Sequence, residues 1–322
     1  MPKLIRRSLL LVDISKMSIP EPVLRANSDV LILDLETVPQ QQRSSLPQSE
    51  MLSILAAAGR NAAEVFIRVQ PDTVAMDLEV AVWPGLNGIF LPRVEHAGEV
   101  QEVSKLLADL EHRRGIREGS LKIDAEIGTA AGVWNALEIA RSSPRMVALS
   151  VGETSLYQDL QLDIEAHLDK DPLRFIKGQI IVNARAAGIQ AQGISYPLSI
   201  TLEAAEESIL KPAVRRARDT GFKGAVCPHI SWVKVCNEGF RPSDEEIAYY
   251  RKVREVFADG VRRGLASVPL DGKMVDVPVD RRARSFLEWG EQCARRDKEK
   301  ARALAYKVGV PYIAIGSQDS LP

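Results

Sequence analysis

DVLILDLE, residues 29–36, is a short apolar run that ends in two carboxylates. Similar β-branched or leucine-rich runs recur along the chain, and a longer stretch with helical spacing follows each of them. This alternation is typical of βα units around a parallel sheet. The runs expected to form strands are Ser8–Val12, Val30–Leu35, Val65–Val69, Asn87–Leu91, Lys122–Ile127, Met146–Val151, Gly188–Ser195 and Gly224–Pro228.

Eight such strands in roughly 230 residues match the size of a (β/α)8 barrel. A doubly wound open sheet fits the alternation almost as well, so periodicity alone leaves both architectures open. Helical spacing is evident in Ala97–Arg113, Ala131–Arg141 and Ala204–Thr220, whereas Gln40–Gln48 is predicted to be a polar loop.

The pattern changes after residue 242. Ser243 and Glu246 form a capping box that begins a long charged helix. We expect a helix to about Arg263, a loop over Gly264–Pro278 that turns at Asp271-Gly272, and a second charged helix over Val279–Lys307. The chain therefore divides into residues 1–242, which carry the strands, and a helical arm over residues 243–322.

The composition excludes several classes of protein. The 322 residues carry 42 basic and 43 acidic side chains, so the basic excess of a nucleic-acid-binding protein is missing. No segment approaches the ~18 uninterrupted apolar residues of a membrane span. Three cysteines without CxxC spacing fit a reducing cytosol. We therefore expect a cytoplasmic protein that binds neither nucleic acid nor membrane.

Charged residues close several of the expected strands. Asp34 and Glu36 end the second, two positions apart and hence on one face, and Arg68 ends the third. In a parallel barrel the carboxyl ends of the strands build the active site, although strand ends also often carry solvated charges. Arg68 could bind a substrate carboxylate in a bidentate geometry that lysine cannot reproduce.

Six segments stand out together: RSLL at 7–10, DVLILDLE at 29–36, FIRVQ at 66–70, LPRVE at 91–95, GFKG at 221–224 and DGKMVDVP at 271–278. In collinear order, from about Arg7 to Ala283, they resemble the motifs of one family, the HpcH/HpaI aldolase and citrate lyase β-subunit-like proteins.

This resemblance implies a TIM (β/α)8 barrel with a C-terminal helical arm that contacts a neighbouring subunit, in a homotrimer or hexamer. It implies carbon–carbon lyase or aldolase activity on a short carboxylated acyl-CoA thioester or hydroxy-oxo acid, usually with Mg²⁺ to neutralise an oxo-acid carboxylate and carbonyl. It also assigns Asp276, contributed by the neighbouring subunit, as an acid or base on the acyl fragment. The alternative for Asp276 is that it caps the following helix.

The chain departs from the family at both usual metal ligands. The positions that resemble the family's Glu and Asp are Gly128 and Ser155, and neither offers the anionic oxygen that Mg²⁺ prefers. Glu126 and Glu153 lie two residues upstream of these positions. In a strand, a shift of two residues leaves the side chain on the same face and moves it about 6.5 Å along the strand. Either these two are relocated ligands or the metal site has decayed. The segment 195–203 also lacks the family's Asp-rich run.

The expected substrate contacts are Arg68, Arg7, Asp34 and Glu36, together with Gly152, Glu153, Thr154 and Ser155, whose backbone N–H groups could hold a carboxylate. The leading hypothesis is a lyase of the citrate lyase β-like type. Because Gly128 and Ser155 replace the metal ligands, the alternative is a non-catalytic or metal-independent barrel that retains ligand binding or a subunit role.

Overall fold

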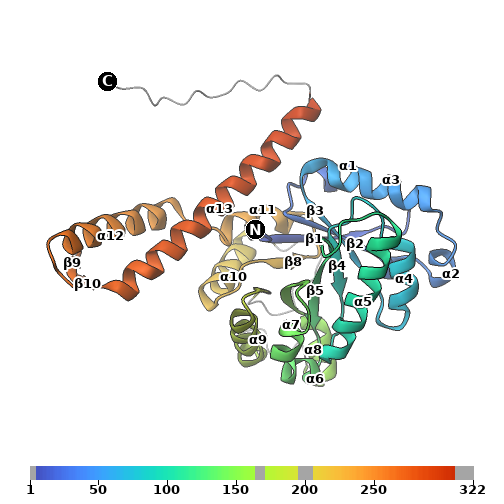
Figure 1. Ribbon diagram of the computed structural model, residues 1–322, viewed down its shortest axis with the longest axis horizontal. Coiled ribbons are helices and arrows are strands. Elements are labelled where there is room, and N and C mark those ends of the chain that lie inside the picture. The colour runs from blue at the N-terminus through green and yellow to red at the C-terminus, as the bar shows by residue number, and fades with distance from the viewer. Residues whose placement is uncertain (1–4, 164–170, 195–205, 309–322) are drawn as a thin grey trace.

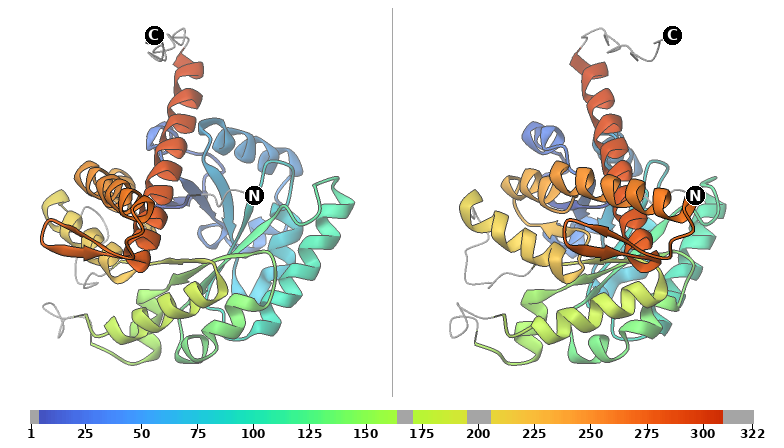
Figure 2. Two further views of the ribbon diagram at one scale, coloured as in Figure 1. Left: turned by 60° about the vertical axis from the view of Figure 1, so that its left-hand side comes forward. Right: turned by 90° about the vertical axis from the view of Figure 1, so that its left-hand side faces the viewer.

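The computed structural model describes residues 5–163, 171–194 and 206–308. Eight parallel strands follow one another in the order β7-β6-β5-β4-β3-β2-β1-β8 and curve into a barrel (Figures 1 and 2). Their bounds are β1 Ser8–Asp13, β2 Val30–Asp34, β3 Glu64–Arg68, β4 Gly88–Leu91, β5 Lys122–Ile127, β6 Met146–Val151, β7 Gln190–Gln192 and β8 Ala225–Cys227.

Contacts between the ends of β7 and β8 nearly close the barrel. Gln192 bridges to Gly224 in parallel, and the Gly193 N–H donates to the Gly224 carbonyl oxygen over 2.9 Å. This closure excludes the open sheet that periodicity had left possible, and the expected TIM barrel is confirmed.

Apolar runs form these strands because both of their faces are covered. All five residues of β2 are buried, which is typical of parallel strands with a packed interior and helices outside. The interior is filled by Leu9, Val30, Ile32, Phe66 and Phe90. Gly88 makes room for this packing, because a Cβ at that position would lie 2.6 Å from the Phe66 ring.

Helices surround the barrel (Figure 2). Their bounds are α1 Glu21–Arg25, α2 Gln40–Arg43, α3 Gln48–Ala58, α4 Val74–Ala81, α5 Ala97–Arg113, α6 Ala130–Trp134, α7 Ala136–Arg141, α8 Glu153–Asp159, α9 Arg174–Ala187, α10 Glu207–Thr220 and α11 Ser231–Gly239, with short 3₁₀ turns at η1 Leu35–Thr37, η2 Gly59–Asn61 and η3 Pro71–Thr73. Two expectations need correction. Residues 40–48 include the short helix α2, and the helix expected over Ala131–Arg141 breaks at Asn135, whose side chain donates to the Glu95 carbonyl oxygen.

The arm consists of α12 Asp244–Arg262, β9 Val268–Leu270, β10 Lys273–Val275 and α13 Val277–Val308. The sequence predicted only a loop between the two helices, and that prediction was incomplete. Asp271 and Gly272 both adopt positive φ, at 49° and 75°, as a tight hairpin turn requires, so β9 and β10 pair. Tyr250, Val253 and Phe257 pack with the hairpin in a small core of the arm's own.

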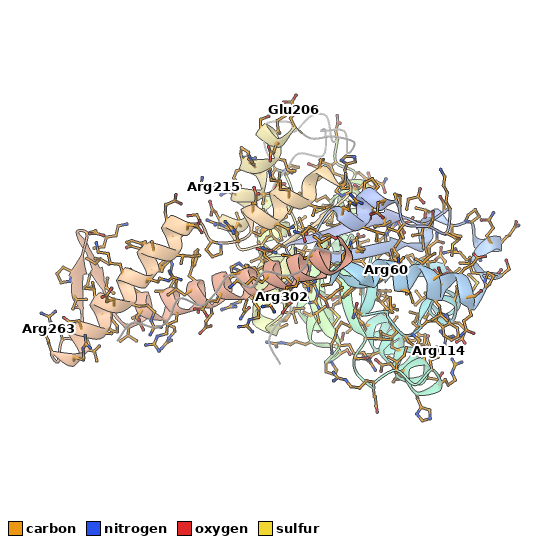
Figure 3. All side chains as sticks on the ribbon, turned by 90° about the horizontal axis from the view of Figure 1, so that it is seen from above. Arg60, Arg114, Glu206, Arg215, Arg263 and Arg302 are labelled. Carbon is orange, nitrogen blue, oxygen red and sulfur yellow. The ribbon has the colours of Figure 1, made fainter. Side chains whose placement is uncertain are left out.

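The stretch of α13 from Trp289 to Lys300 packs against the barrel, and the end of the helix projects beyond it (Figure 2). Figure 3 shows Arg263 at the free end of the arm and Arg302 close to the barrel. Among the described residues no helix combines the length and hydropathy needed to cross a membrane.

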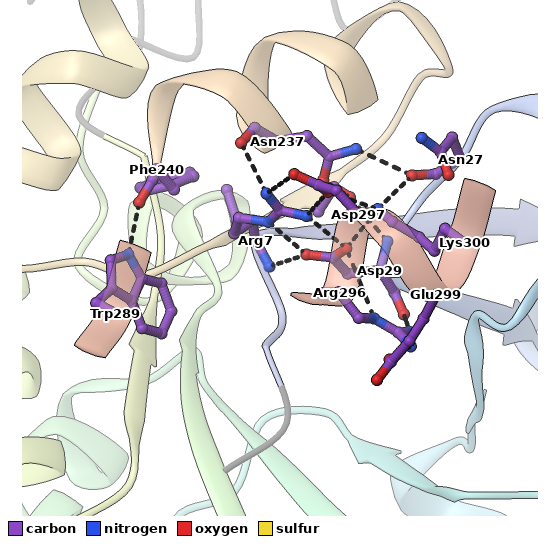
Figure 4. A network of polar contacts seen from close by, with 12 residues as sticks. Arg7, Asn27, Asp29, Asn237, Phe240, Trp289, Arg296, Asp297, Glu299 and Lys300 are labelled. Carbon is purple, nitrogen blue, oxygen red and sulfur yellow. Dashed lines mark hydrogen bonds and ion pairs between the residues drawn. The ribbon is translucent and has the colours of Figure 1, made fainter. Parts of the chain in front are cut away.

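A buried ionic network fastens α13 to the amino end of the barrel (Figure 4). The Asp29 carboxylate receives hydrogen bonds from Arg7 and from Lys300, the latter over 2.6 Å, while Arg7 also bonds to Asp297. The side chains of Arg7, Asp29 and Lys300 are fully buried. The arm is therefore joined to the barrel at its end as well as at its start.

Candidate functional site

A cavity of about 240 Å³ opens at the carboxyl ends of the strands. Its lining combines apolar side chains with charged ones, and Trp232 borders it from α11. The lining residues are Leu11, Arg68, Phe90, Glu126, Val151, Gly152, Glu153, Thr154, Ser155, Gln192, Gly193, Ile194, Ala225, Val226, Pro228 and Trp232. We call this cavity the mouth.

Arg68 reaches the mouth from the last position of β3. Asp34 ends the neighbouring strand in register with it, so the two side chains meet, with Arg68 Nη1 3.0 Å from Asp34 Oδ2. Glu36 forms a second ion pair with the same nitrogen. The structure thus brings together three residues that the sequence had grouped.

Electrostatics fix the charge of Arg68. Burial by itself would lower the pKa of the guanidinium, but Asp34, Glu126 and Glu36 outweigh burial and raise it. Burial raises the pKa of Asp34 despite the opposing Arg68 charge. Arg68 is therefore a permanent cation, and Glu36, with a side chain 52% exposed, is its more accessible partner.

Glu126 comes from β5 and faces the same space. Its carboxylate lies over Gly152, where an added Cβ would be 2.8 Å from Glu126 Oε1, so only glycine leaves room for it. Burial raises the pKa of Glu126, and the charges of Arg68 and Arg93 counter part of that rise. The Gly152 N–H donates to the Ile127 carbonyl oxygen. This N–H is therefore not free to bind a ligand carboxylate.

Glu153 is the first residue of α8, and its carboxylate points elsewhere. It lies 2.7 Å from the buried Lys177 ammonium, which also contacts Asp171 at 2.8 Å. Burial raises the pKa of Glu153 to about 7, against the opposing charge of Lys177. Glu126 and Glu153 therefore have different charged partners, which does not support a relocated metal site between them.

The two usual metal positions do meet in space. A Cβ built on Gly128 would lie 2.8 Å from the Ser155 Cβ, so the two residues are in contact and no carboxylate lies between them. Within the described ranges no group of three or more His, Cys, Asp or Glu side chains is arranged to hold a metal ion. The residues present at this place do not fit Mg²⁺.

Two predicted site residues lie elsewhere. Arg7 precedes β1 at the opposite, amino end of the barrel, and its side chain is fully buried by Asp29 and Asp297. Arg7 therefore does not line the mouth, contrary to the expectation that it lies with the other substrate contacts. Asp276 accepts a hydrogen bond from the Val279 N–H over 3.1 Å and so caps α13. The departure over 195–203 lies outside the described residues.

Beneath the mouth lies a buried polar group that the sequence analysis missed. The Ser150 hydroxyl is 2.8 Å from both Asp124 Oδ1 and Gln192 Oε1, and burial raises the pKa of Asp124 to about 7. One hydroxyl proton cannot serve two acceptors, so the set is satisfied either by a proton on Asp124 or by a Gln192 amide turned so that its NH2 donates to Ser150. Lys122, Asp124 and Glu126 alternate along β5, and this period of two could have revealed a polar inner face.

Fold and site together define a parallel (β/α)8 barrel with a charged cavity at the carboxyl ends of its strands and a helical arm. Residues 7–229 match the family HpcH/HpaI aldolase/citrate lyase, and the chain belongs to this family. The predicted family is thereby confirmed.

Relatives extend this assignment. The chain is 26% identical to the citrate lyase subunit beta of Haemophilus influenzae, over 91% of this chain and 99% of that one. It is 27% identical to the (3S)-malyl-CoA thioesterase of Cereibacter sphaeroides, over 84% and 89%. The fold is similar to that of CitE from Mycobacterium tuberculosis bound to magnesium, acetoacetate and coenzyme A, with a TM-score of 0.63 and 24% identity over 90% and 99% of the chains.

Proposed function

We propose that the mouth binds a short carboxylate, free or within an acyl-CoA thioester, and that the protein is a cytoplasmic carbon–carbon lyase or aldolase of the citrate lyase β-like type. The observation that carries this proposal is Arg68, a half-buried and permanently charged guanidinium that lines the cavity. A ligand carboxylate displaces the exposed Glu36, while Asp34 continues to orient the guanidinium.

The relatives support the substrate class. Citrate lyase β subunits and malyl-CoA thioesterases share most of this chain, and the similar CitE structure holds a short oxo acid with coenzyme A. Coenzyme A enters here as part of the substrate. Magnesium is present in that CitE structure, but the contact between Gly128 and Ser155 does not support the same use of Mg²⁺ in this chain.

A second candidate function is a non-catalytic barrel that still binds ligand. The same Gly128–Ser155 contact favours it, because no anionic oxygen replaces the missing ligands at that place. Turnover of a panel of acyl-CoA thioesters by the purified protein, followed by release of free coenzyme A or of an oxo acid, separates the two. Binding without turnover across the panel would favour the second.

The test of the first proposal is Arg68→Ala, assayed by calorimetry with oxaloacetate. We expect loss of ligand binding with only a small change in melting temperature, because Asp34 keeps its hydrogen bond from the Glu36 N–H. Arg113→Ala, which removes an exposed arginine on α5, is the control. An Arg68→Ala protein that binds oxaloacetate as the unmodified protein does would contradict the proposal.

We also propose that the arm contacts a neighbouring subunit of a homotrimer or hexamer and delivers Asp276 there. Met274 and Val277, on either side of Asp276, are 67% and 53% exposed. Such apolar exposure at the end of an arm is typical of an interface. Met274→Glu should therefore reduce the oligomer mass measured by light scattering. Lys273→Glu, beside it on the hairpin, is the control for added charge, and equal masses for all three proteins would count against the contact.

A further inference from the structure

Arg93 lies beside the place where the metal ligands are missing. It follows β4, and its Cγ would be 3.4 Å from a Cβ on Gly128, the same atom that would meet the Ser155 Cβ. Its charge acts on Glu126, which lines the mouth. A cationic side chain thus covers the glycine that stands where the family has a carboxylate.

The backbone holds Arg93 in an unusual conformation. Its φ is 51°, in the left-handed region that residues other than glycine rarely adopt. The next residue, Val94, donates its N–H to the Glu126 carbonyl oxygen over 2.9 Å, and its own carbonyl oxygen would be 2.4 Å from a Cβ on Gly132. The turn is therefore fixed on one side by β5 and on the other by α6, which sets the backbone position from which the Arg93 side chain extends.

Arg93 is exposed, and its guanidinium forms no hydrogen bond or ion pair with the described residues, whereas Arg68, which lines the mouth, pairs with Asp34 and Glu36. An arginine without a partner at the rim of a cavity can bind an anion without first breaking another contact. Two cations are therefore available to a ligand here. Arg68 lines the mouth and holds two carboxylates, and Arg93 stands beside the mouth with no such partner among the described residues.

We propose that Arg93 supplies the positive charge that a divalent cation would otherwise bring, so that the mouth binds a short dicarboxylate, or a carboxylated acyl group, without metal. One end of the ligand meets Arg68, and Arg93 binds the oxygens at the other. This inference rests on the proposed function and deepens it by naming the ligand class and the group that replaces the ion.

The experiment is calorimetric titration of the full-length protein with oxaloacetate, after treatment with EDTA and again with millimolar Mg²⁺. We expect the same affinity in both conditions. Arg93→Asn should weaken binding about tenfold or more, which corresponds to about 1.4 kcal/mol. Asparagine is chosen because it tolerates the left-handed backbone conformation. Arg93→Gly, which adopts positive φ without strain, is a second charge-removing variant if the first folds poorly.

Two controls complete the design. Arg93→Lys keeps the charge and should retain most of the affinity, whereas Arg117→Asn removes an exposed arginine before β5, at the other end of the barrel, and should change nothing. Binding that EDTA abolishes and Mg²⁺ restores would overturn the inference, as would full affinity in Arg93→Asn or Arg93→Gly. Failure of the unmodified protein to bind in either condition would instead refute the proposed function itself.

Discussion

Replacing Asp29 with asparagine should destabilise the protein more than any change at the mouth. The Asp29 carboxylate accepts hydrogen bonds from the Arg7 N–H at 2.9 Å, from Arg7 Nε at 2.8 Å and Nη2 at 3.0 Å, and from Lys300 Nζ at 2.6 Å. Asparagine keeps the size but loses the charge. Arg7 and Lys300 would then be left buried with Asp297 as their remaining anion, whose side chain is 37% exposed.

The expected loss in the free energy of unfolding follows from the burial of these charges. Removing one partner of a buried ion pair costs about 3–5 kcal/mol, because the other charge stays buried without compensation. Native proteins are stable by roughly 5–15 kcal/mol, so Asp29→Asn should remove a large part of the total. It should also loosen α13 around Lys300, which these bonds join to the barrel.

The dependence on pH gives a second signature. Burial alone would raise the pKa of Asp29, but Arg7 and Lys300 outweigh it, and the folded-state pKa is lowered. A lowered carboxyl pKa contributes stability that is present above the unfolded value, about 3.9, and is lost as the pH falls through the folded value. The difference between Asp29→Asn and the unmodified protein should therefore be full at pH 7 and shrink in acid below about pH 4.

The assay is equilibrium unfolding in urea, at pH 7 and at several acidic values. Asp259→Asn is the control, because that residue pairs with Arg262 and Arg263 on the surface and should cost no more than about 1 kcal/mol. An Asp29→Asn protein within about 1 kcal/mol of the unmodified one at pH 7 would refute the reasoning, since the network would then carry no net stability.

Two further predictions concern the arm and the missing metal ligands. Asp276→Asn should change the free energy of unfolding little, because asparagine caps a helix about as well as aspartate, whereas turnover of a substrate found in the thioester panel should be lost if Asp276 is catalytic. An Asp276→Asn protein with full turnover would show that Asp276 caps the helix and is not catalytic. Gly128→Glu combined with Ser155→Asp should gain Mg²⁺ binding by calorimetry but lower the melting temperature, since a Cβ at Gly128 already meets the Ser155 Cβ at 2.8 Å. No heat with Mg²⁺ would show that two ligands do not suffice here.

The sequence predicted the barrel well because each strand is marked locally. The apolar run of β2 and the helical spacing that follows each strand are short-range features, and six of the strands match their expected positions closely. The shorter β7 and β8 span three residues each and depend on contacts across the closure between Gln192 and Gly224. The hairpin of the arm was missed for a similar reason, because three-residue strands leave little periodic signal although the turn at Asp271 was recognised.

The site was predictable where the register between adjacent strands alone determines which side chains meet. Asp34 and Arg68 end adjacent parallel strands in register, so their meeting follows from strand order. Arg7 could not be placed in the same way. Its partner Asp297 lies 290 residues further on, and only the return of α13 to the barrel brings the two together. A motif at the start of a strand therefore proved to be part of the ionic network rather than of the mouth.

The two carboxylates upstream of the missing ligands show where periodic reasoning reaches its limit. A shift of two residues preserves the face only while the chain remains a strand. Glu126 lies within β5, keeps the inward face and lines the mouth as the argument requires. Glu153 lies beyond the end of β6, at the first position of α8, where each residue turns by about 100° instead of 180°. Its carboxylate consequently turns toward Lys177 on α9. One relocated ligand would thus remain without a second, and Arg68 is the cation that faces Glu126 in the mouth.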